Sequence, residues 1–250
     1  MNVSTTPSQL LLVRHGESAG NVARALAMQS KLPRIELATR DVDIPLSQRG
    51  EEQAQALGHW LGRLPEHERP QVAWCSPYVR ARETLVRVLQ AAGLTELTPR
   101  VDERLREKEF GILDGLTAHG IAAEFPEQAR ARQAVGKFYH RPPGGESWCD
   151  VILRLRSALE SMFRECAGQR VLVVSHQVVV LCMRYLLEQL DESGVLAIDA
   201  AGDVANCSVT SYAADPSGRL VLSKYNFVAP LQVEGAAVTT TPDAPAPPRS

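Results

Sequence analysis

A cationic side chain and a titratable one directly follow an apolar run near the start of the chain. Residues 9–13 read QLLLV, and Arg14 and His15 come next. A guanidinium offers a planar fork of N–H donors that suits a phosphate or a carboxylate. A neutral imidazole is a nucleophile that attacks phosphorus and gives a phosphohistidine. The pair therefore indicates a nucleophile beside an anion-binding group, with a surface Arg–His pair at a strand end as the simpler alternative.

Two further candidate residues follow later apolar runs. Arg80 lies shortly after the run QVAWCS (71–76), and His176 directly follows RVLVVS (170–175) and opens a helix. The free backbone amides and the dipole at a helix start favour an anion. Because other arginines share the helix of Arg80, a surface role is its alternative, and a hydrogen-bonded core histidine is the alternative for His176.

A phosphoryl transfer also needs a proton donor for the leaving oxygen. The stretch ERLREKEFG (103–111) supplies glutamates at positions 103, 107 and 109. The ionised form of a carboxyl group near an anionic phosphate is disfavoured, and this suits a general acid. Spacing alone leaves the choice among the three glutamates open.

The elements that must position these residues alternate between strand and helix. The expected strands cover 9–13, 71–76, 97–101 and 170–175, the expected helices cover 47–63, 77–93, 148–167 and 177–190, and a hairpin runs through 207–227. This order predicts a three-layer α/β/α fold with a mostly parallel central sheet. Ligands in such sheets bind beyond the carboxyl ends of the strands, so Arg14, His15, Arg80 and His176 should converge there.

The ends of the chain differ in composition from its centre. Residues 1–8 read as a flexible leader, and residues 9–233 show no linker or internal repeat and are read as one catalytic domain. Residues 234–250 are rich in Pro, Ala and Thr, and Val238 is their only large apolar residue. Such a composition predicts a disordered tail.

Bulk composition excludes several classes of partner and compartment. The 250 residues carry a net charge of −2 and are 44% hydrophobic, which points to neither a nucleic acid nor an anionic membrane as partner. No apolar run reaches the roughly 20 residues that cross a bilayer. The N-terminal residues do not resemble a signal peptide. The five cysteines are odd in number and form no CxxC pair, so we expect reduced thiols in a cytoplasmic protein.

Six segments, taken in order, resemble the motifs of the histidine phosphatase superfamily, also called the phosphoglycerate mutase-like family. They are RHGE (14–17), DIPLSQRGEEQAQALG (43–58), CSPYVRARET (75–84), LREKEFG (105–111), PPGGESW (142–148) and VLVVSHQ (171–177). The resemblance covers roughly residues 9 to 228 and implies a phosphoglycerate mutase-like fold.

The resemblance also implies roles for single residues. His15 would be the phosphorylated nucleophile, Glu107 the proton donor and His176 a further catalytic residue of the pocket. The implied substrate-binding residues are Arg14, Asn21 and Arg80. Neither a metal nor a cofactor is implied, since side chains supply the positive charge.

The function implied by these motifs is a metal-independent phosphatase that hydrolyses a small phosphomonoester through a phosphohistidine on His15. The alternatives are a phosphoglycerate mutase-type phosphotransferase and a non-catalytic protein that binds a phosphorylated partner. Gln177 and the stretch NCSVT (206–210) resemble the fructose-2,6-bisphosphatase branch, and Phe110 stands where cofactor-dependent mutases carry Tyr. Both features favour the phosphatase. A homodimer is compatible with this function.

Three expectations concern the surroundings of the pocket. The segment 22–42 carries four basic residues and is expected to form a lid or wall over the pocket. Arg141 is a candidate contact for a second anionic group of the substrate. Gly16 is expected to let the chain turn without covering the His15 imidazole.

Overall fold

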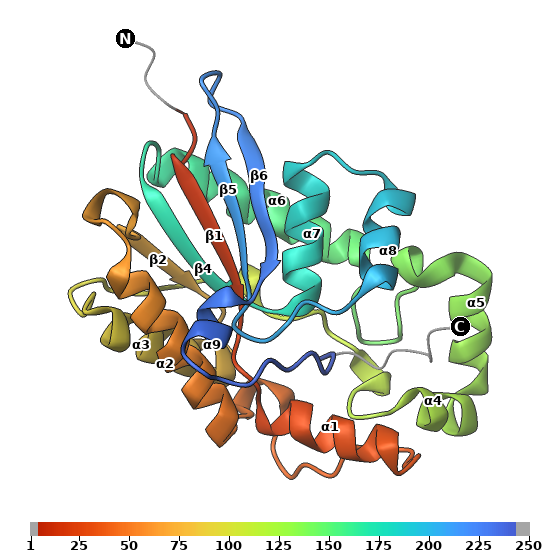
Figure 1. Ribbon diagram of the computed structural model, residues 1–250. Helices are drawn as coiled ribbons and strands as arrows, with labels where there is room; N and C mark the ends of the chain where they lie inside the picture. The colour runs from red at the N-terminus through yellow and green to blue at the C-terminus, as the bar shows by residue number, and fades with distance from the viewer. Residues whose placement is uncertain (1–4, 244–250) are drawn as a thin grey trace.

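The framework of the molecule is one six-stranded sheet (Figure 1). The computed structural model describes residues 5–243. The strands are β1 (Gln9–Arg14), β2 (Val72–Cys75), β3 (Arg100–Val101), β4 (Arg170–Ser175), β5 (Val209–Ala214) and β6 (Leu220–Phe227), in the order β3-β2-β4-β1-β5-β6. The pairs β1–β4, β2–β4 and β2–β3 are parallel, whereas β5 pairs antiparallel with β1 and with β6. The mostly parallel α/β sheet predicted from the sequence is confirmed.

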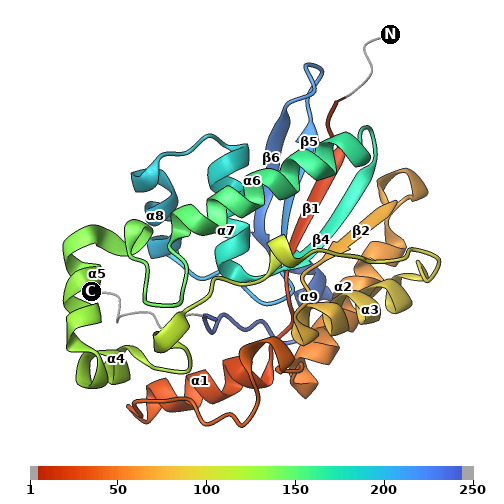
Figure 2. The same cartoon turned by 180° about the vertical axis from the view of Figure 1, so that it is seen from behind.

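Helices cover both faces of this sheet, as the alternation of apolar side chains along β1 requires. Leu11 and Val13 pack with α2 (Gln48–Arg63) and α3 (Val79–Ala92). Leu10 and Leu12 pack on the opposite face with α6 (Trp148–Glu165) and α7 (Gln177–Leu187). Figure 2 shows α6 crossing the strands on this second face. Successive side chains of a strand point to opposite faces, so both layers are held by one run of apolar residues.

Several helices were not expected from the sequence. They are α1 (Ala19–Gln29), α4 (Ala118–Glu124), α5 (Pro126–Tyr139), α8 (Glu192–Ala201) and α9 (Ala229–Val233), with short 3-10 turns at Asp41–Asp43, Glu66–Glu68, Glu103–Leu105 and Gly111–Leu113. Helices α1 and α4 lie beyond the carboxyl end of β1 (Figure 1). The Ser18 side chain caps α1 in a reciprocal capping box with Asn21. These elements bound the region where the predicted site residues emerge.

Both ends of the described chain are attached to the domain. The amide of Ser8 donates to the carbonyl of Gln169 (2.9 Å), and Thr6 Oγ1 donates to the carbonyl of Gly218 (2.7 Å). The sequence predicts disorder for residues 234–250, and the structure differs over 234–243, which hydrogen-bond to buried polar side chains. Composition did not reveal this attachment because its contacts are polar rather than apolar. Residues 1–4 of the expected leader and 244–250 of the expected tail lie outside the described residues.

Within residues 5–243, no helix has the length and apolar character that crossing a membrane requires. Val178–Met183 of α7 is the most continuously apolar helical stretch, and it is buried in the core against α6. The hydrophobicity of α7 is therefore used for packing within the domain.

Two glycines let the end of β1 lie directly against the start of α2. A Cβ atom on Gly16 would lie 2.5 Å from the carbonyl oxygen of Gly50, and a Cβ on Gly50 would lie 1.9 Å from the carbonyl oxygen of Glu17. Both obstacles are backbone atoms, which cannot rotate away. The reason for Gly16 is therefore this close approach, and not the free turn that we expected from the sequence.

Replacing Gly50 with alanine should destabilise the fold. Overpacking a tight contact costs about 1–3 kcal/mol, and we expect Gly50→Ala to lower the free energy of unfolding by about 2 kcal/mol or more in urea titrations. Gly202→Ala is the matched control, because no atom lies within 4 Å of the added Cβ. Equal stabilities of the Gly50 and Gly202 variants would contradict the close-approach argument.

Candidate active site

Three of the predicted site residues meet at the carboxyl ends of neighbouring strands. His15 follows β1, Arg80 lies in the first turn of α3 behind β2, and His176 caps α7 behind β4. The Arg80 Nε atom lies 3.2 Å from His15 Nε2, and the His15 and His176 ring centroids lie 5.1 Å apart. All three side chains are buried. The convergence predicted from the strand order is confirmed.

The backbone fixes the tautomer of His15. Its Nδ1 lies 2.7 Å from the carbonyl oxygen of Gly16, which can only accept, so Nδ1 carries the proton in this contact. Nε2 is then left with its lone pair facing the pocket. Burial lowers the pKa of His15, against the opposing effect of the Asp243 carboxylate. A neutral imidazole whose Nε2 keeps its lone pair, here accepting from Arg80 Nε, is the form that a nucleophile requires.

Arg14 and Asn21 border the same space from β1 and α1. Arg14 Nη1 donates to the carbonyl of Val204 (2.6 Å), which holds the guanidinium in place. Asn21 Oδ1 accepts from the amide of Ser18 (3.0 Å), so its Nδ2 is directed to the pocket. Both residues are buried, and each donates to the carboxylate of Asp243 and to the carbonyl of Thr241.

Asp243 comes from the C-terminal segment and was not among the predicted site residues. Its Oδ1 accepts from Arg14 Nη2 and from Asn21 Nδ2, both at 2.8 Å, and its Oδ2 lies 3.3 Å from Arg14 Nε. Its oxygens lie 3.2 and 3.3 Å from His15 Nε2. Burial opposes its ionisation, but the charge of Arg14, with that of Arg80 beside it, outweighs burial and holds the pKa of Asp243 well below its usual range. A carboxylate therefore occupies the space in front of His15 Nε2.

Arg80 has an acidic partner, Asp41, that the sequence did not predict. Its Nη1 and Nη2 donate to Asp41 Oδ1 (3.0 Å) and Oδ2 (3.1 Å), and Nη1 also donates to the carbonyl of Asp41 (2.6 Å). This fork leaves the Arg80 Nε directed at His15. The two residues lie 39 positions apart, and neither the charge pattern nor the spacing of the segment marks Asp41 as a partner of Arg80.

His176 is held by the side chain of Ser76, which directly follows β2. Its Nε2 lies 2.7 Å from Ser76 Oγ, while its Nδ1 is buried without a hydrogen-bond partner among the described residues. Burial lowers the pKa of His176 well below its usual value, and the nearby Arg80 charge adds to this effect. A neutral ring with an unsatisfied nitrogen has hydrogen-bonding capacity left for a ligand.

Glu107 is the buried member of the three candidate glutamates. Its Oε1 accepts from the amide of Lys108 (2.8 Å) and its Oε2 from the amide of Val178 in the first turn of α7 (3.4 Å). Burial, assisted by the charge of Asp243, raises the pKa of Glu107 to about 8. Glu103 is exposed, and Glu109 is half-exposed and accepts from the Tyr78 hydroxyl. Glu107 is therefore the carboxyl group that is protonated at neutral pH beside the pocket.

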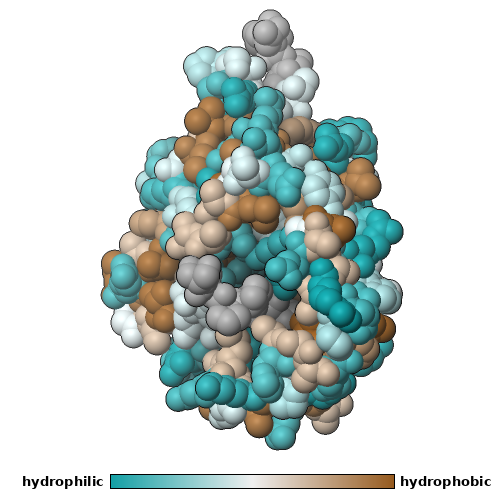
Figure 3. Space-filling model, turned by 90° about the vertical axis from the view of Figure 1, so that its right-hand side faces the viewer, coloured by the Kyte–Doolittle hydropathy of each residue, from teal (hydrophilic) through white to brown (hydrophobic). Residues whose placement is uncertain are grey.

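A cavity of about 340 Å³ adjoins this site. Its wall includes Ser18, Gly20, Asn21, Arg24, Arg34, Ile35, Leu37, Thr39, Asp41, Ile44, Arg80, Asp114, Gly115 and Asp243. The expectation that 22–42 forms a wall is confirmed by this lining. Arg141, in contrast, is paired with Asp150 and does not line the cavity. The side of the molecule turned to the viewer in Figure 3 is hollowed, and hydrophilic residues surround much of the hollow.

A family model described as "Histidine phosphatase superfamily (branch 1)" matches residues 10–227 of the chain. The chain belongs to the histidine phosphatase superfamily. A 6-phosphofructo-2-kinase/fructose-2,6-bisphosphatase of Caenorhabditis elegans is 34% identical over 184 residues, which cover 73% of this chain and 35% of that protein. A 2,3-bisphosphoglycerate-dependent phosphoglycerate mutase 2 of Gloeobacter violaceus is also 34% identical over 184 residues, which cover 73% of this chain and 75% of that protein. The chain thus spans about a third of the first relative and most of the second.

Solved structures with the same fold include further members. A mycobacterial glucosyl-3-phosphoglycerate phosphatase in complex with VO3 is 29% identical and superposes with a TM-score of 0.66, covering 88% of this chain and 99% of that one. Bacillus stearothermophilus YhfR is 27% identical with a TM-score of 0.70, covering 89% and 98%. The phosphoglycerate mutase-like fold implied by the motifs is confirmed.

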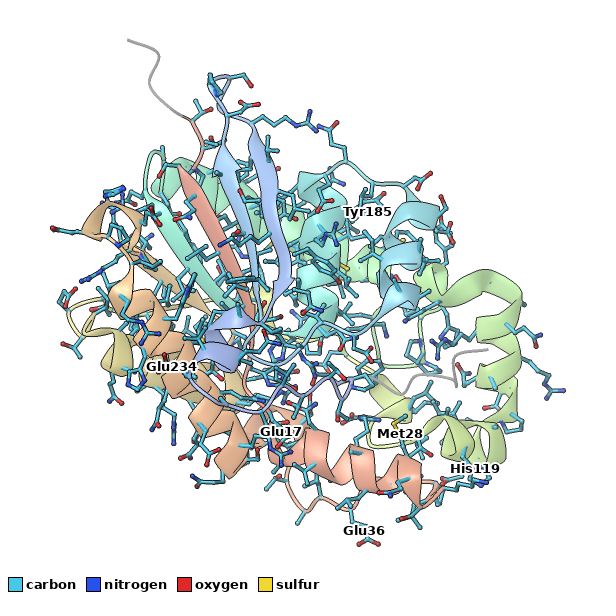
Figure 4. The ribbon with its side chains drawn as sticks, in the orientation of Figure 1. Glu17, Met28, Glu36, His119, Tyr185 and Glu234 are labelled. Atoms are coloured by element: carbon cyan, nitrogen blue, oxygen red, sulfur yellow. The ribbon has the colours of Figure 1, made fainter. Side chains whose placement is uncertain are left out.

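The RHGE glutamate of this superfamily member connects the site to α2. Glu17 lies beyond the end of β1 (Figure 4), where its Oε1 accepts from Ser47 Oγ (2.8 Å). Its amide donates to Gln53 Oε1 (2.8 Å) from the middle of α2. Glu17 therefore helps to fix the loop that carries His15, and its contacts are with the protein rather than with the cavity.

Three potential metal ligands lie together in the pocket. Ligand atoms of His15, His176 and Asp243 lie within 4.8 Å of one another. The guanidiniums of Arg14 and Arg80 approach the same space, and their charge would repel a cation there. The residues present thus fit an anion better than a metal ion.

Replacing Glu107 should change the pH dependence of stability. The pKa of Glu107 is raised in the folded state. Its contribution to the free energy of unfolding is therefore fully present below the usual pKa of 4.5 and is lost as pH rises through about 8. Glu107→Gln cannot ionise, and it should be more stable than the native protein at pH 9 by a few kcal/mol, at ~1.4 kcal/mol per pKa unit. Urea unfolding at pH 5 and pH 9 measures the difference, which should be small at pH 5. Glu103→Gln, an exposed control, should behave like the native protein at both pH values.

Proposed function

We propose that this superfamily member is a phosphatase that transfers the phosphoryl group of a small phosphomonoester to His15 and then to water. The observation that carries the proposal is the space in front of His15 Nε2. The Arg14 guanidinium and the Asn21 amide already hold an anionic group there, with Arg80 Nε alongside. A phosphoryl group in the same place would face an unprotonated nucleophile.

The first step forms a bond between His15 Nε2 and phosphorus and breaks the bond between phosphorus and the ester oxygen. Glu107, protonated at neutral pH because burial raises its pKa to about 8, gives its proton to the leaving oxygen. Arg14, Asn21 and Arg80 stabilise the charge on the phosphoryl oxygens as the group moves. The unsatisfied Nδ1 of His176 adds hydrogen-bonding capacity at the same site.

The second step releases the phosphoryl group to water. A water oxygen attacks phosphorus, the bond to Nε2 breaks, and the Glu107 carboxylate takes a proton from the water. Inorganic phosphate leaves, and Glu107 is again protonated for the next cycle. The side chains supply both the positive charge and the proton transfers, so we propose that turnover needs no metal ion.

Replacing His15 tests the covalent step. Native protein incubated with a 32P-labelled phosphomonoester in EDTA should acquire acid-labile, base-stable label, and His15→Ala should acquire none and lose about 10³-fold or more in kcat. His67→Ala, whose side chain is 80% exposed, is the control. Full turnover of the His15 variant would contradict the mechanism. With 3-phosphoglycerate, faster isomerisation than phosphate release would favour the mutase, and tight binding without either reaction would favour a non-catalytic role.

The cavity next to the phosphoryl position is suited to the leaving group of a small substrate. Arg24 lines it and is 5% exposed, and its one hydrogen bond among the described residues is from Nη1 to the carbonyl of Leu116 (3.2 Å). No carboxylate within residues 5–243 lies within ion-pair distance of Arg24, whereas Arg34 is paired with Glu124 and Arg80 with Asp41. We propose that Arg24 binds a second anionic group of the substrate.

A matched pair of substrates tests the role of Arg24. In 3-phosphoglycerate a carboxylate replaces the terminal hydroxymethyl group of glycerol 3-phosphate. Arg24→Gln should lower kcat/KM for 3-phosphoglycerate by about ten-fold or more, because a charged hydrogen bond is lost, and should affect glycerol 3-phosphate much less. Arg40→Gln, with an 80% exposed side chain, is the control. Equal losses on both substrates would exclude this role for Arg24.

The compartment is a proposal of its own. All five cysteines are free thiols, and four of them are buried. Free thiols persist where the environment is reducing, which supports a cytoplasmic location for the enzyme. Its partner in this proposal is the small phosphorylated substrate alone, without a nucleic acid or a membrane.

A further inference from the structure

The segment after α9 is attached to the domain through two buried polar residues. Gln53 Nε2 donates to the carbonyl of Ala237 (2.8 Å) and to Thr239 Oγ1 (2.9 Å). The backbone amide of Asn206 donates to the carbonyl of Thr239 (2.9 Å), and the side-chain Oδ1 of Asn206 accepts from Thr239 Oγ1 (2.9 Å). Gln53 and Asn206 are both fully buried. Thr239 is thus the anchor of the segment, at a point between α2 and the end of β1.

Beyond this anchor, the segment enters the pocket itself. The carbonyl of Thr241 accepts from Arg14 Nη2 and from Asn21 Nδ2 (3.2 Å). Asp243 then places its two carboxylate oxygens against Arg14, Asn21 and His15, and its side chain is 4% exposed. In Figure 1 the segment runs from α9 below the strand ends and above α1. The Thr241 carbonyl and the Asp243 carboxylate therefore contact residues that, in the proposed mechanism, bind the phosphoryl group.

The Asp243 carboxylate and a phosphoryl group compete for the same donors. A carboxylate is a planar oxyanion and a phosphoryl group is a tetrahedral one, and each can accept two parallel hydrogen bonds from a guanidinium. With Asp243 bound, Arg14 is engaged through Nε and Nη2, Asn21 through Nδ2, and His15 Nε2 faces a carboxylate oxygen. No second anion can make these contacts until Asp243 leaves.

We propose that the phosphate pocket is a binding site for this chain's own segment 236–243, and that Asp243 is a tethered competitor of the substrate. The proposal rests on the proposed function, since the pocket must be the place where the phosphoryl group binds. A short tether gives a ligand an effective concentration on the order of millimolar, so even a weakly binding carboxylate occupies the site for much of the time. The substrate displaces it at saturation. The segment therefore raises KM and leaves kcat unchanged.

Two variants release the segment without changing a residue of the reaction. Asp243→Asn removes the charge that binds Arg14, and Thr239→Val removes the hydroxyl that bonds to Gln53 and Asn206. Each should lower KM by about five-fold or more and keep kcat within two-fold of the native value, on a full-length chain with any phosphomonoester it hydrolyses. Glu96→Gln removes an exposed acid elsewhere and is the charge control.

A binding measurement separates this proposal from the proposed function. Isothermal titration with inorganic phosphate requires no turnover, and Asp243→Asn should bind it about five-fold or more tightly than the native chain. A synthetic peptide of residues 236–243 should compete with phosphate for Asp243→Asn. A protein that binds phosphate more tightly after the substitution but hydrolyses no ester would retain the segment's role and refute the phosphatase. Unchanged phosphate affinity, or a fall in kcat that marks Asp243 as a positioning residue for His15, would overturn the segment's role.

Discussion

The structure of the pocket depends on the burial of positive charge. Arg14 is 0% exposed and Arg80 is 2% exposed. A guanidinium cannot give up its proton at any ordinary pH, so both residues carry buried positive charges. A buried charge is tolerated only when an opposite charge compensates for it. Asp41 compensates for Arg80 and Asp243 compensates for Arg14. A pocket built in this way must hold an anion. In our proposal that anion is either the phosphoryl group of the substrate or the carboxylate of Asp243.

The same burial sets the protonation states that the proposed chemistry needs. Burial lowers the pKa of His15 and raises that of Glu107 to about 8, so the order of the two values is reversed relative to free side chains. Near neutral pH the imidazole is then unprotonated and the carboxyl group protonated, as the proposed nucleophile and the proposed proton donor must be. Pairs of groups whose environments push their pKa values apart are the usual sign of acid and base roles. One physical cause, the exclusion of water from the strand ends, prepares both partners.

The sequence was informative where local pattern and topology determine position. The runs ending at Val13, Ser76 and Ser175 predicted parallel strands, and their shared edge brought His15, Arg80 and His176 together. In the sequence, only the motif distinguished Glu107 from Glu103 and Glu109. In the structure, Glu107 is the one of the three that is buried. The spacing gave no sign that Asp41 would pair with Arg80, because such a pair depends on how the loop after α1 folds back.

The C-terminal segment could not be predicted for a related reason. Its composition lacks the apolar residues that would bury it, and composition is what sequence-based expectations of disorder measure. Its attachment instead uses backbone carbonyls, one hydroxyl and one carboxylate, which meet polar side chains that the fold leaves buried and partly unsatisfied. The partners lie 33 to 229 positions away. Only the assembled domain reveals that its buried donors match this segment.

The geometry of the anchor also constrains how the pocket can open. Asp243 lies four positions after Thr239, and an extended chain covers roughly 3.3–3.6 Å per residue. With Thr239 still bonded to Gln53 and Asn206, the Cα atom of a displaced Asp243 remains within about 14 Å of the Thr239 Cα atom. In the proposed competition, a phosphoryl dianion brings more negative charge to Arg14 than the single charge of Asp243, so substrate would displace the carboxylate without detaching the segment. When inorganic phosphate leaves, the nearest anion able to compensate for Arg14 is again Asp243, and the buried guanidinium is not left without a partner.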